Sequence, residues 1–140
     1  MLLKMKTDVS EIATLCNKLE EFCAEHKISD RKAFDIAIIA DEMATNVISY
    51  AYQDGQEHLF VVEVTKEDDQ VRIQIIDDGI PFDPLKKCDP KLDESLYERT
   101  IGGLGIYLTK KLSKLVTYER KDEHNYLNIF IDVNGESDGN

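Results

Sequence analysis

The stretch from Ser29 to Tyr52 constrains this chain most, because it has the length and pattern of one long helix. It contains neither proline nor glycine, starts at a serine that can serve as N-cap, and is long enough for about six turns. Apolar residues fill most of the helix circumference, which predicts that it is mainly buried. The polar residues form one narrow stripe facing either a strip of water or a polar pocket; the helix alone favours water. They are Asp35, Glu42, Asn46, Ser49 and Gln53.

The composition is that of a soluble globular domain, with 140 residues, of which 42% are hydrophobic and 32% charged. A formal net charge of −11 argues against binding to nucleic acid or to anionic membranes, whose phosphates require a basic surface. A nucleotide is not excluded, because Mg²⁺, backbone N–H groups and a few local cations can neutralise its phosphates. No apolar run approaches a membrane span, and the N-terminal MLLKMKTD lacks a signal-peptide pattern, so we expect a cytoplasmic protein.

Two further helices are predicted from apolar residues that recur at helical spacing. The first runs from Asp8 to near Lys27, and Asp8 with Glu11 resembles a capping box. The long helix is expected to end around Asp54-Gly55, where the glycine can adopt a left-handed conformation. The last helix covers residues 101–115.

Strands are predicted where apolar and polar residues alternate. A hairpin turn at 67–69 joins two of them, and the alternation predicts one packed and one wet face, as in an antiparallel sheet. We therefore expect an α+β fold, a two-layer α/β sandwich with helices on one face of a mostly antiparallel sheet. Residues 1–134 would form a single domain, followed by a disordered tail over 135–140. The expected strands lie near residues 2–7, 60–65, 71–75, 115–121 and 127–133.

Asp77 stands at the end of a predicted strand, two residues before Gly79. It alternates in step with Val71, Ile73 and Ile75, so its carboxylate should point toward the helix-covered side. Burying a carboxylate costs roughly several kcal/mol of folding free energy unless it accepts hydrogen bonds. It can cap the turn by accepting from the N–H groups of Gly79 or Ile80. It can also accept a hydrogen bond from an exocyclic amine, with Gly79 letting a ring approach the backbone.

A long connection over residues 79–100 contains all three prolines and leads into the glycine-rich segment 101–106. Connections of this length are typical of lids and binding loops. A surface loop without a binding role would also explain the length. Glycines at a helix N-terminus expose N–H groups that can cradle a phosphate, and a lid hinge explains them nearly as well. The segment has neither the P-loop nor the dinucleotide-binding pattern.

These three signals occur in the strings DEMATNVISYAY, DDGIPFDP and ERTIGGLGI. Together they resemble the ATP-binding domain of the gyrase and histidine-kinase ATPase superfamily, the Bergerat fold, over nearly the whole chain. The strings are most similar to those of small bacterial anti-sigma regulatory factors that act as serine-protein kinases. The resemblance implies binding of Mg²⁺ and ATP and phosphorylation of a serine of an antagonist protein.

The resemblance also assigns roles to individual residues. Glu42 would be the catalytic base for the hydroxyl that attacks the γ-phosphate, and Asn46 would ligate Mg²⁺. Asp77 would bind the adenine amino group, with Gly79 beside the ring. The ATP lid would span about 80–101. The remaining nucleotide-binding residues would be Arg99, near the phosphates, and Gly102, Gly103, Leu104 and Gly105, through their backbone N–H groups.

Two positions depart from the family pattern. Pro81 stands where a second glycine is usual, which stiffens that loop. Asn125-Tyr126 replaces the usual Gly-Thr before the last strand, which would remove one adenine-side contact and lower the affinity.

The resemblance implies partners as well as an activity. The 140 residues leave no room for a phosphoacceptor or transducer domain, so we expect a module that acts on a separate protein. The implied partners are an anti-anti-sigma protein of the STAS type and a sigma factor. The alternative is a non-catalytic switch in which nucleotide gates protein binding. A scaffold without nucleotide binding is a third reading, and a homodimer is an alternative to a monomer.

Overall fold

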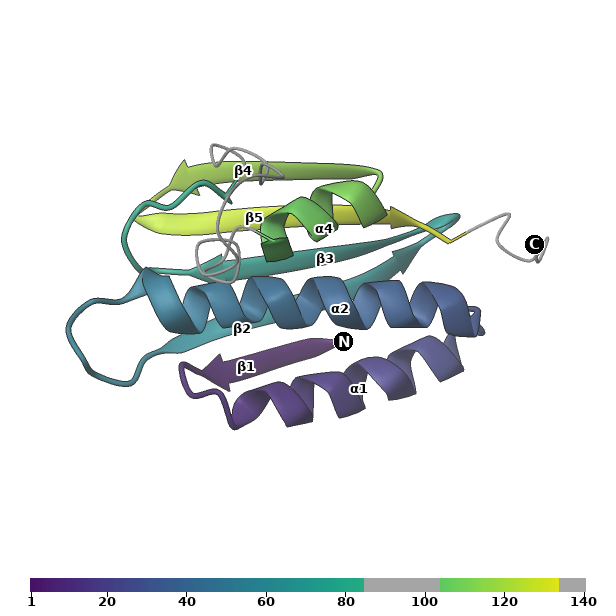
Figure 1. The fold of residues 1–140 in the computed structure, drawn as a ribbon, viewed down its shortest axis with the longest axis horizontal. Coiled ribbons are helices and arrows are strands. Elements are labelled where there is room, and N and C mark those ends of the chain that lie inside the picture. Colours follow the sequence, from purple (N-terminus) through teal and green to yellow (C-terminus); the bar gives the residue numbers. More distant parts are fainter. Residues whose placement is uncertain (85–103, 134–140) are drawn as a thin grey trace.

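The computed structural model describes residues 1–84 and 104–133, which form one antiparallel sheet covered by helices on one face (Figure 1). The sheet has five strands in the order β1-β2-β3-β5-β4, and every neighbouring pair is antiparallel. The predicted α+β class is therefore confirmed. In chain order the elements are β1 (Leu2–Lys6), α1 (Glu11–Glu25), α2 (Asp30–Asn46), the π-helix η1 (Val47–Ala51), β2 (Leu59–Glu67), β3 (Gln70–Asp77), α4 (Leu104–Leu112), β4 (Leu115–Lys121) and β5 (His124–Asp132).

The predicted strands are confirmed, and their alternation explains the layering of the fold. Along β3 and β5, and in β2 as far as Val64, every second residue faces the helices and is buried, as the two-residue period of a strand requires. Figure 1 shows α1, α2 and α4 lying across this inward face of the sheet. The largest fully buried side chains are Phe60, Met5, Leu15, Leu19, Ile36, Ile39, Ile73, Ile75, Ile129, Ile131, Val62 and Val64.

The first helix forms as predicted, but the predicted capping box is wrong. The Oδ1 atom of Asp8 accepts from the N–H of Ser10, and an oxygen of Glu11 accepts from the N–H of Lys6. Helix α1 therefore starts at Glu11 and has no side-chain cap, because both carboxylates bind the turn that leads out of β1.

The long helix begins as predicted, with the hydroxyl oxygen of Ser29 accepting from the N–H of Lys32 at 3.2 Å. Its last turn widens into the π-helix η1, and Tyr52 is already extended (φ −125°, ψ 134°). The predicted end at Asp54-Gly55 is therefore wrong. The N–H of Ile80 binds the carbonyl of Ala51 at 2.8 Å, so another segment satisfies the helix end.

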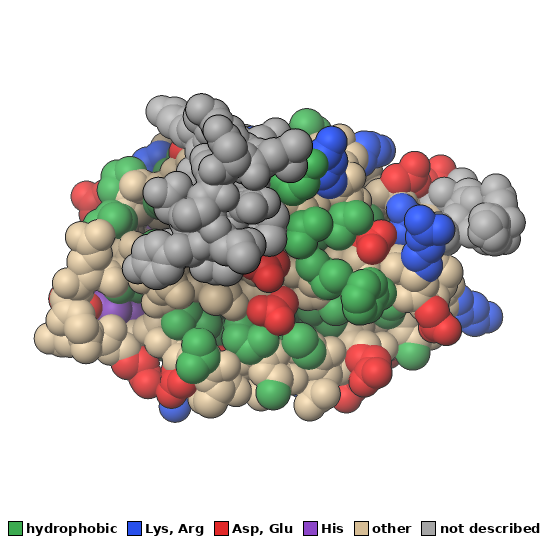
Figure 2. All heavy atoms as spheres, in the orientation of Figure 1, with side chains coloured by type: hydrophobic (Ala, Val, Ile, Leu, Met, Phe, Trp, Pro, Cys, Tyr) green, Lys and Arg blue, Asp and Glu red, His purple; other side chains and the backbone are tan. Residues whose placement is uncertain are grey.

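Some predictions fall on residues that the structure does not describe. These are most of the expected lid, the start of the last predicted helix before Leu104, and the tail over 135–140. In the described ranges, no helix is both long and apolar enough to cross a membrane. Figure 2 shows the helical face, where hydrophobic side chains gather between groups of acidic ones.

Candidate functional site

Helix α2 and its π-helical extension position Asn46 on the side that faces the sheet. Asn46 is only 8% exposed, although it belongs to the predicted polar stripe. Among the described residues its Nδ2 atom is fully buried and has no hydrogen-bond partner. A buried amide without a partner costs about 1–3 kcal/mol, so this nitrogen requires an acceptor that the described residues do not supply. The π-helix begins at the next residue, and π-turns are frequent at functional sites.

Glu42 lies one turn before Asn46, against the first turn of α4. A Cβ built on Gly105 would lie 2.9 Å from the Cδ atom of Glu42 and closer still to Oε1. Burial, followed by the nearby charge of Asp41, raises the pKa of the Glu42 carboxyl above its ordinary value. A half-buried carboxylate with a raised pKa is suited to accept a proton.

Asp77 ends β3 on the inward face of the sheet and is 7% exposed. Its Oδ1 atom accepts from the N–H of Gly79 at 2.9 Å and from the side-chain amide of Asn125 at 2.8 Å. Burial raises the pKa of Asp77, while the hydrogen bonds from Asn125 and Gly79 oppose that rise. The turn-capping role proposed from the sequence is thus present. It uses only one carboxylate oxygen, and Oδ2 has no donor among the described residues.

Asn46 and Asp77 line the same cavity, where the end of the long helix meets the ends of β3 and β5. The cavity has a volume of about 30 Å³, which is room for about two water molecules at roughly 10–15 Å³ each. It must therefore widen to admit a ring. Its other lining residues are Met43, Val47, Ala51, Ile75, Phe82, Pro84, Tyr118, Asn125 and Leu127.

Gly79 has a structural role that the sequence did not indicate. A Cβ at this position would lie 2.7 Å from the carbonyl carbon and from the Cβ of Ala51, and closer to the Ala51 oxygen. The absence of a side chain therefore lets the turn after β3 pack directly on the end of η1. This contact joins the element that carries Asn46 to the strand that carries Asp77.

Asn125 is the site residue that sequence reasoning missed. It is 4% exposed, and its Nδ2 atom donates to Asp77 and, at 2.8 Å, to the carbonyl of Ile80. Its Oδ1 atom accepts from the hydroxyl of Tyr118 and, at 3.2 Å, from Arg120. The available signal is an asparagine at an inward position of β5 whose other inward residues are apolar. The family pattern alone indicates only a missing contact at this position.

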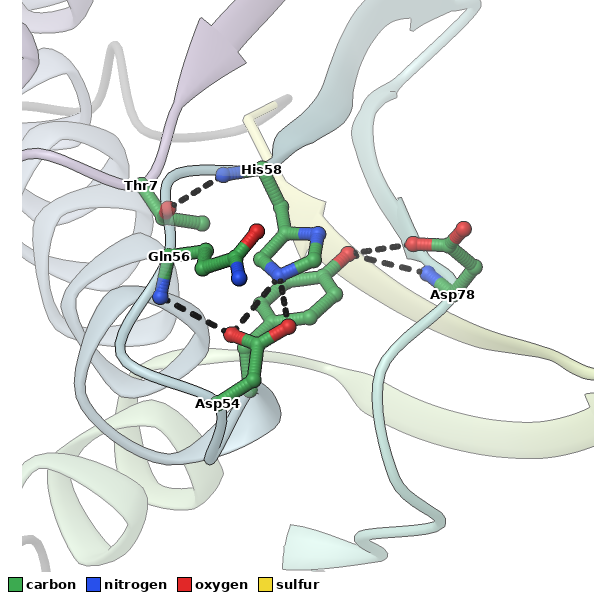
Figure 3. Close-up of polar contacts among 6 residues, drawn as sticks. Thr7, Asp54, Gln56, His58 and Asp78 are labelled. Atoms are coloured by element: carbon green, nitrogen blue, oxygen red, sulfur yellow. Dashed lines mark hydrogen bonds and ion pairs between the residues drawn. The ribbon is translucent and has the colours of Figure 1, made fainter.

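A second polar cluster holds the loop after η1 against the strand end (Figure 3). The hydroxyl of Tyr52 donates to Asp78 at 2.6 Å, and the Tyr52 ring stacks on His58 at 4.0 Å between centroids. The Nε2 atom of the His58 ring also contacts the carboxylate of Asp54 at 2.8 Å. The backbone N–H of His58 donates to the hydroxyl oxygen of Thr7. The loop is thereby tied to Asp78, the neighbour of Asp77.

The structure brings together part of the predicted site. Asn46 and Asp77 share the cavity, with Gly79 beside it, whereas Glu42 is not among the lining residues and lies toward α4. Gly105 contacts Glu42, and Leu104 is the first residue of α4. The predicted residues Arg99, Gly102 and Gly103 lie outside the described ranges.

The fold is similar to two solved structures. One is the crystal structure of the RsbU and RsbW domains of Rv1364c from Mycobacterium tuberculosis, with a TM-score of 0.67 and 16% identity, covering 95% of this chain and 32% of that one. The other is the SiaB-SiaC complex from Pseudomonas aeruginosa, with a TM-score of 0.66 and 18% identity, covering 94% and 88%. At these identities the likeness concerns the fold, and this chain spans about a third of the chain in the Mycobacterium structure.

Sequence comparison extends the likeness to a curated protein. The chain is 27% identical over 131 residues to the serine/threonine-protein kinase BtrW of Bordetella bronchiseptica, covering 89% of this chain and 92% of BtrW. The pattern of the histidine kinase-like ATPase domain matches residues 5–131, which include Glu42, Asn46 and Asp77. The expectation drawn from the sequence motifs is confirmed, and the chain belongs to the histidine kinase-like ATPase domain family.

Proposed function

We propose that this protein is a serine kinase of the anti-sigma type. It binds Mg²⁺ and ATP in the cavity between η1 and β3 and phosphorylates a serine of an antagonist of the STAS type. The observation that carries the proposal is a pair of polar groups that line one cavity: the amide nitrogen of Asn46 and the Oδ2 atom of Asp77, neither of which has a hydrogen-bond partner among the described residues. The relative BtrW, a serine/threonine-protein kinase, supports the type of reaction.

The base of the nucleotide is assigned to the Asp77 end of the cavity. The Oδ2 atom of Asp77 has no donor among the described residues, so it can accept a hydrogen bond from the adenine amino group. Gly79 keeps the strand end close to η1. Because the cavity is small, it must widen to admit the adenine base, and its wall at Phe82 and Pro84 belongs to the described first residues of the proposed lid over about 80–101.

The phosphates are assigned to the other end, between α2 and the start of α4. Asn46 fits a magnesium ion, because its amide oxygen is a suitable ligand and Mg²⁺ takes few ligands from the protein. When bound, the ion neutralises phosphate charge. Backbone N–H groups of Gly102, Gly103, Leu104 and Gly105, together with Arg99, complete this assignment.

Glu42 is proposed as the catalytic base. Its carboxylate takes the proton of the serine hydroxyl as that oxygen attacks the γ-phosphorus and the bond to the leaving ADP oxygen breaks. The raised pKa of Glu42 makes its carboxylate a stronger base than an exposed glutamate. Gly105 leaves the space beside Oε1 in which the carboxylate is held.

The experiment combines the full chain with labelled ATP, Mg²⁺ and a candidate STAS-type antagonist. We expect label on an antagonist serine with the wild type and none with Glu42→Gln. Asp35→Asn on the same helix is the matched control and keeps full transfer. An unlabelled antagonist, or full transfer by Glu42→Gln, contradicts the kinase assignment.

A nucleotide-gated binding switch without phosphoryl transfer is the second candidate. The observation that favours it is that Glu42 lies outside the cavity lining. It predicts that ATP changes the affinity for the antagonist equally in the wild type and in Glu42→Gln. An affinity that does not depend on ATP eliminates the switch.

We further propose that residues 1–134 form one domain that also sequesters a sigma factor and that can form a homodimer. The solved SiaB-SiaC complex supports association of this fold with a separate protein. Size-exclusion chromatography with the sigma factor, with and without ATP and antagonist, tests this. Co-elution that the antagonist reverses supports sequestration, and separate elution under every condition contradicts it.

A further inference from the structure

Asn125 binds four groups from three segments at the Asp77 end of the cavity, where the adenine base is assigned. Its amide nitrogen donates to Asp77 in β3 and to the carbonyl of Ile80, while its oxygen accepts from Tyr118 and Arg120 in β4. A side-chain amide offers two donors and one carbonyl acceptor with two lone pairs, so all its capacity is used.

The orientation of this amide is fixed by chemistry. The Ile80 carbonyl can only accept a hydrogen bond, so it requires the amide nitrogen. The guanidinium of Arg120 can only donate, so it requires the amide oxygen, and it also binds the carbonyl of Gly79 at 2.7 Å. A flipped amide would lose both partners. Asn125 therefore always presents a donor to Asp77.

This arrangement determines which atom of Asp77 a ligand meets. Oδ1 receives the N–H groups of Asn125 and Gly79, and Oδ2, which has no donor within residues 1–84 and 104–133, is the oxygen that we assign to the ligand. A carboxylate oxygen accepts hydrogen bonds and repels other acceptors. A purine with an amino group at position 6 offers it a donor, whereas a 6-oxo purine offers a second oxygen.

We propose that Asn125 is a specificity-determining positioning residue that makes the site select 6-amino over 6-oxo purine nucleotides. It holds Asp77 in the one orientation in which a free oxygen faces the base. The inference rests on the proposed function, because it requires a nucleotide in this cavity. This role of Asn125 differs from the expectation drawn from the sequence, which was only that replacing the usual Gly-Thr pair removes one contact to the adenine.

The test measures dissociation constants for Mg·ATP and Mg·ITP, which differ at position 6 of the purine. We expect the wild type to prefer ATP, and Asn125→Ala to lower the ratio of the two affinities about tenfold, equivalent to about 1.4 kcal/mol. Asn125→Asp keeps the shape but presents an acceptor to Asp77 and Ile80, so it lowers the ratio as well. If Asn125→Ala does not fold, the affinity ratio of Asn125→Asp tests the role of Asn125. Asn128→Ala, on the opposite face of β5 beside Gln74, is the matched control and keeps the ratio.

The outcomes separate the inference from the proposed function. A wild type that binds neither nucleotide contradicts the proposed function itself. A wild type that binds both equally, or folded Asn125 variants that keep the wild-type ratio, overturn the role of Asn125 while leaving a nucleotide site in place.

Discussion

The carboxylate of Glu42 lies against the Cα of Gly105, so the proposed catalytic base is positioned by a glycine in another helix. A Cβ there would overlap Oε1 and lie 3.2 Å from the Cβ of Glu42. The most crowded atom is at the end of a flexible side chain, so the carboxylate can move while the helices stay in place. The contact thus controls where the carboxylate lies more than whether the protein folds.

Gly105→Ala is therefore expected to impair phosphoryl transfer without unfolding the protein. Alanine favours a helix over glycine by up to about 1 kcal/mol, which offsets the cost of moving Glu42. A small displacement of a catalytic group can lower the rate by about 100-fold. Initial rates with labelled ATP and a thermal melt measure both effects. An unchanged rate in the folded variant would show that this contact does not position the base.

Gly79→Ala is expected to lower stability and ATP affinity together. The new Cβ would overlap backbone atoms of Ala51, which cannot rotate away, and overpacking of this kind costs about 3 kcal/mol. Gly55→Ala is the matched control. Its φ of +72° strains alanine by about 1 kcal/mol, but no atom lies within 4 Å of the new Cβ. Denaturant unfolding and ATP titration compare the two variants, and equal ATP affinities in both would contradict the proposed role of Gly79.

Tyr52→Phe is expected to reduce stability by about 1 kcal/mol, because it removes the hydrogen bond to Asp78. Burial, followed by the bond to Asp78, raises the pKa of Tyr52, so its hydroxyl remains a hydrogen-bond donor into the alkaline range where an exposed tyrosine ionises. Tyr126→Phe, on the open face of the sheet, should leave stability unchanged. Urea unfolding of both variants measures the difference in stability. Equal midpoints would contradict a stabilising role for the hydrogen bond between Tyr52 and Asp78 in the cluster of Figure 3.

The pH dependence of transfer should report the environment of Glu42. A base acts when deprotonated, so the rate falls as pH decreases through the raised pKa of Glu42, and falls earlier than for an exposed glutamate. Asp41→Asn removes the nearby negative charge, lowers that pKa and moves the acid limb to lower pH. Asp35→Asn on the same helix leaves the limb in place. Identical limbs in the wild type and Asp41→Asn would mean that Glu42 is not the titrating base.

The fold was predictable because its signals are local. Period-two alternation identified the strands of the sheet, and helical spacing with the N-cap of Ser29 identified the start of the long helix. The predicted helix end was wrong because its last carbonyl is satisfied by Ile80, a residue distant in sequence. The capping box was wrong because Glu11 binds the N–H of Lys6 instead.

The site was only partly predictable, for a related reason. Spacing on one helix places Glu42 one turn before Asn46, and strand parity places Asp77 on the inward face, so these side chains were accessible to sequence reasoning. Asn125 was not, because its role depends on the antiparallel pairing that sets it opposite Asp77. Such cross-strand partners follow from register, which no single segment specifies.

A calorimetric titration of Mg·ATP into the wild type and Asp77→Asn tests directly whether Asp77 holds the base of a bound nucleotide. The asparagine keeps an oxygen for the donors of Gly79 and Asn125, so the fold is maintained, but it turns an amide donor toward the base. We expect one bound ATP per wild-type chain and an affinity at least about tenfold weaker in the variant. Equal affinity for ATP in the two proteins would contradict a nucleotide site at Asp77.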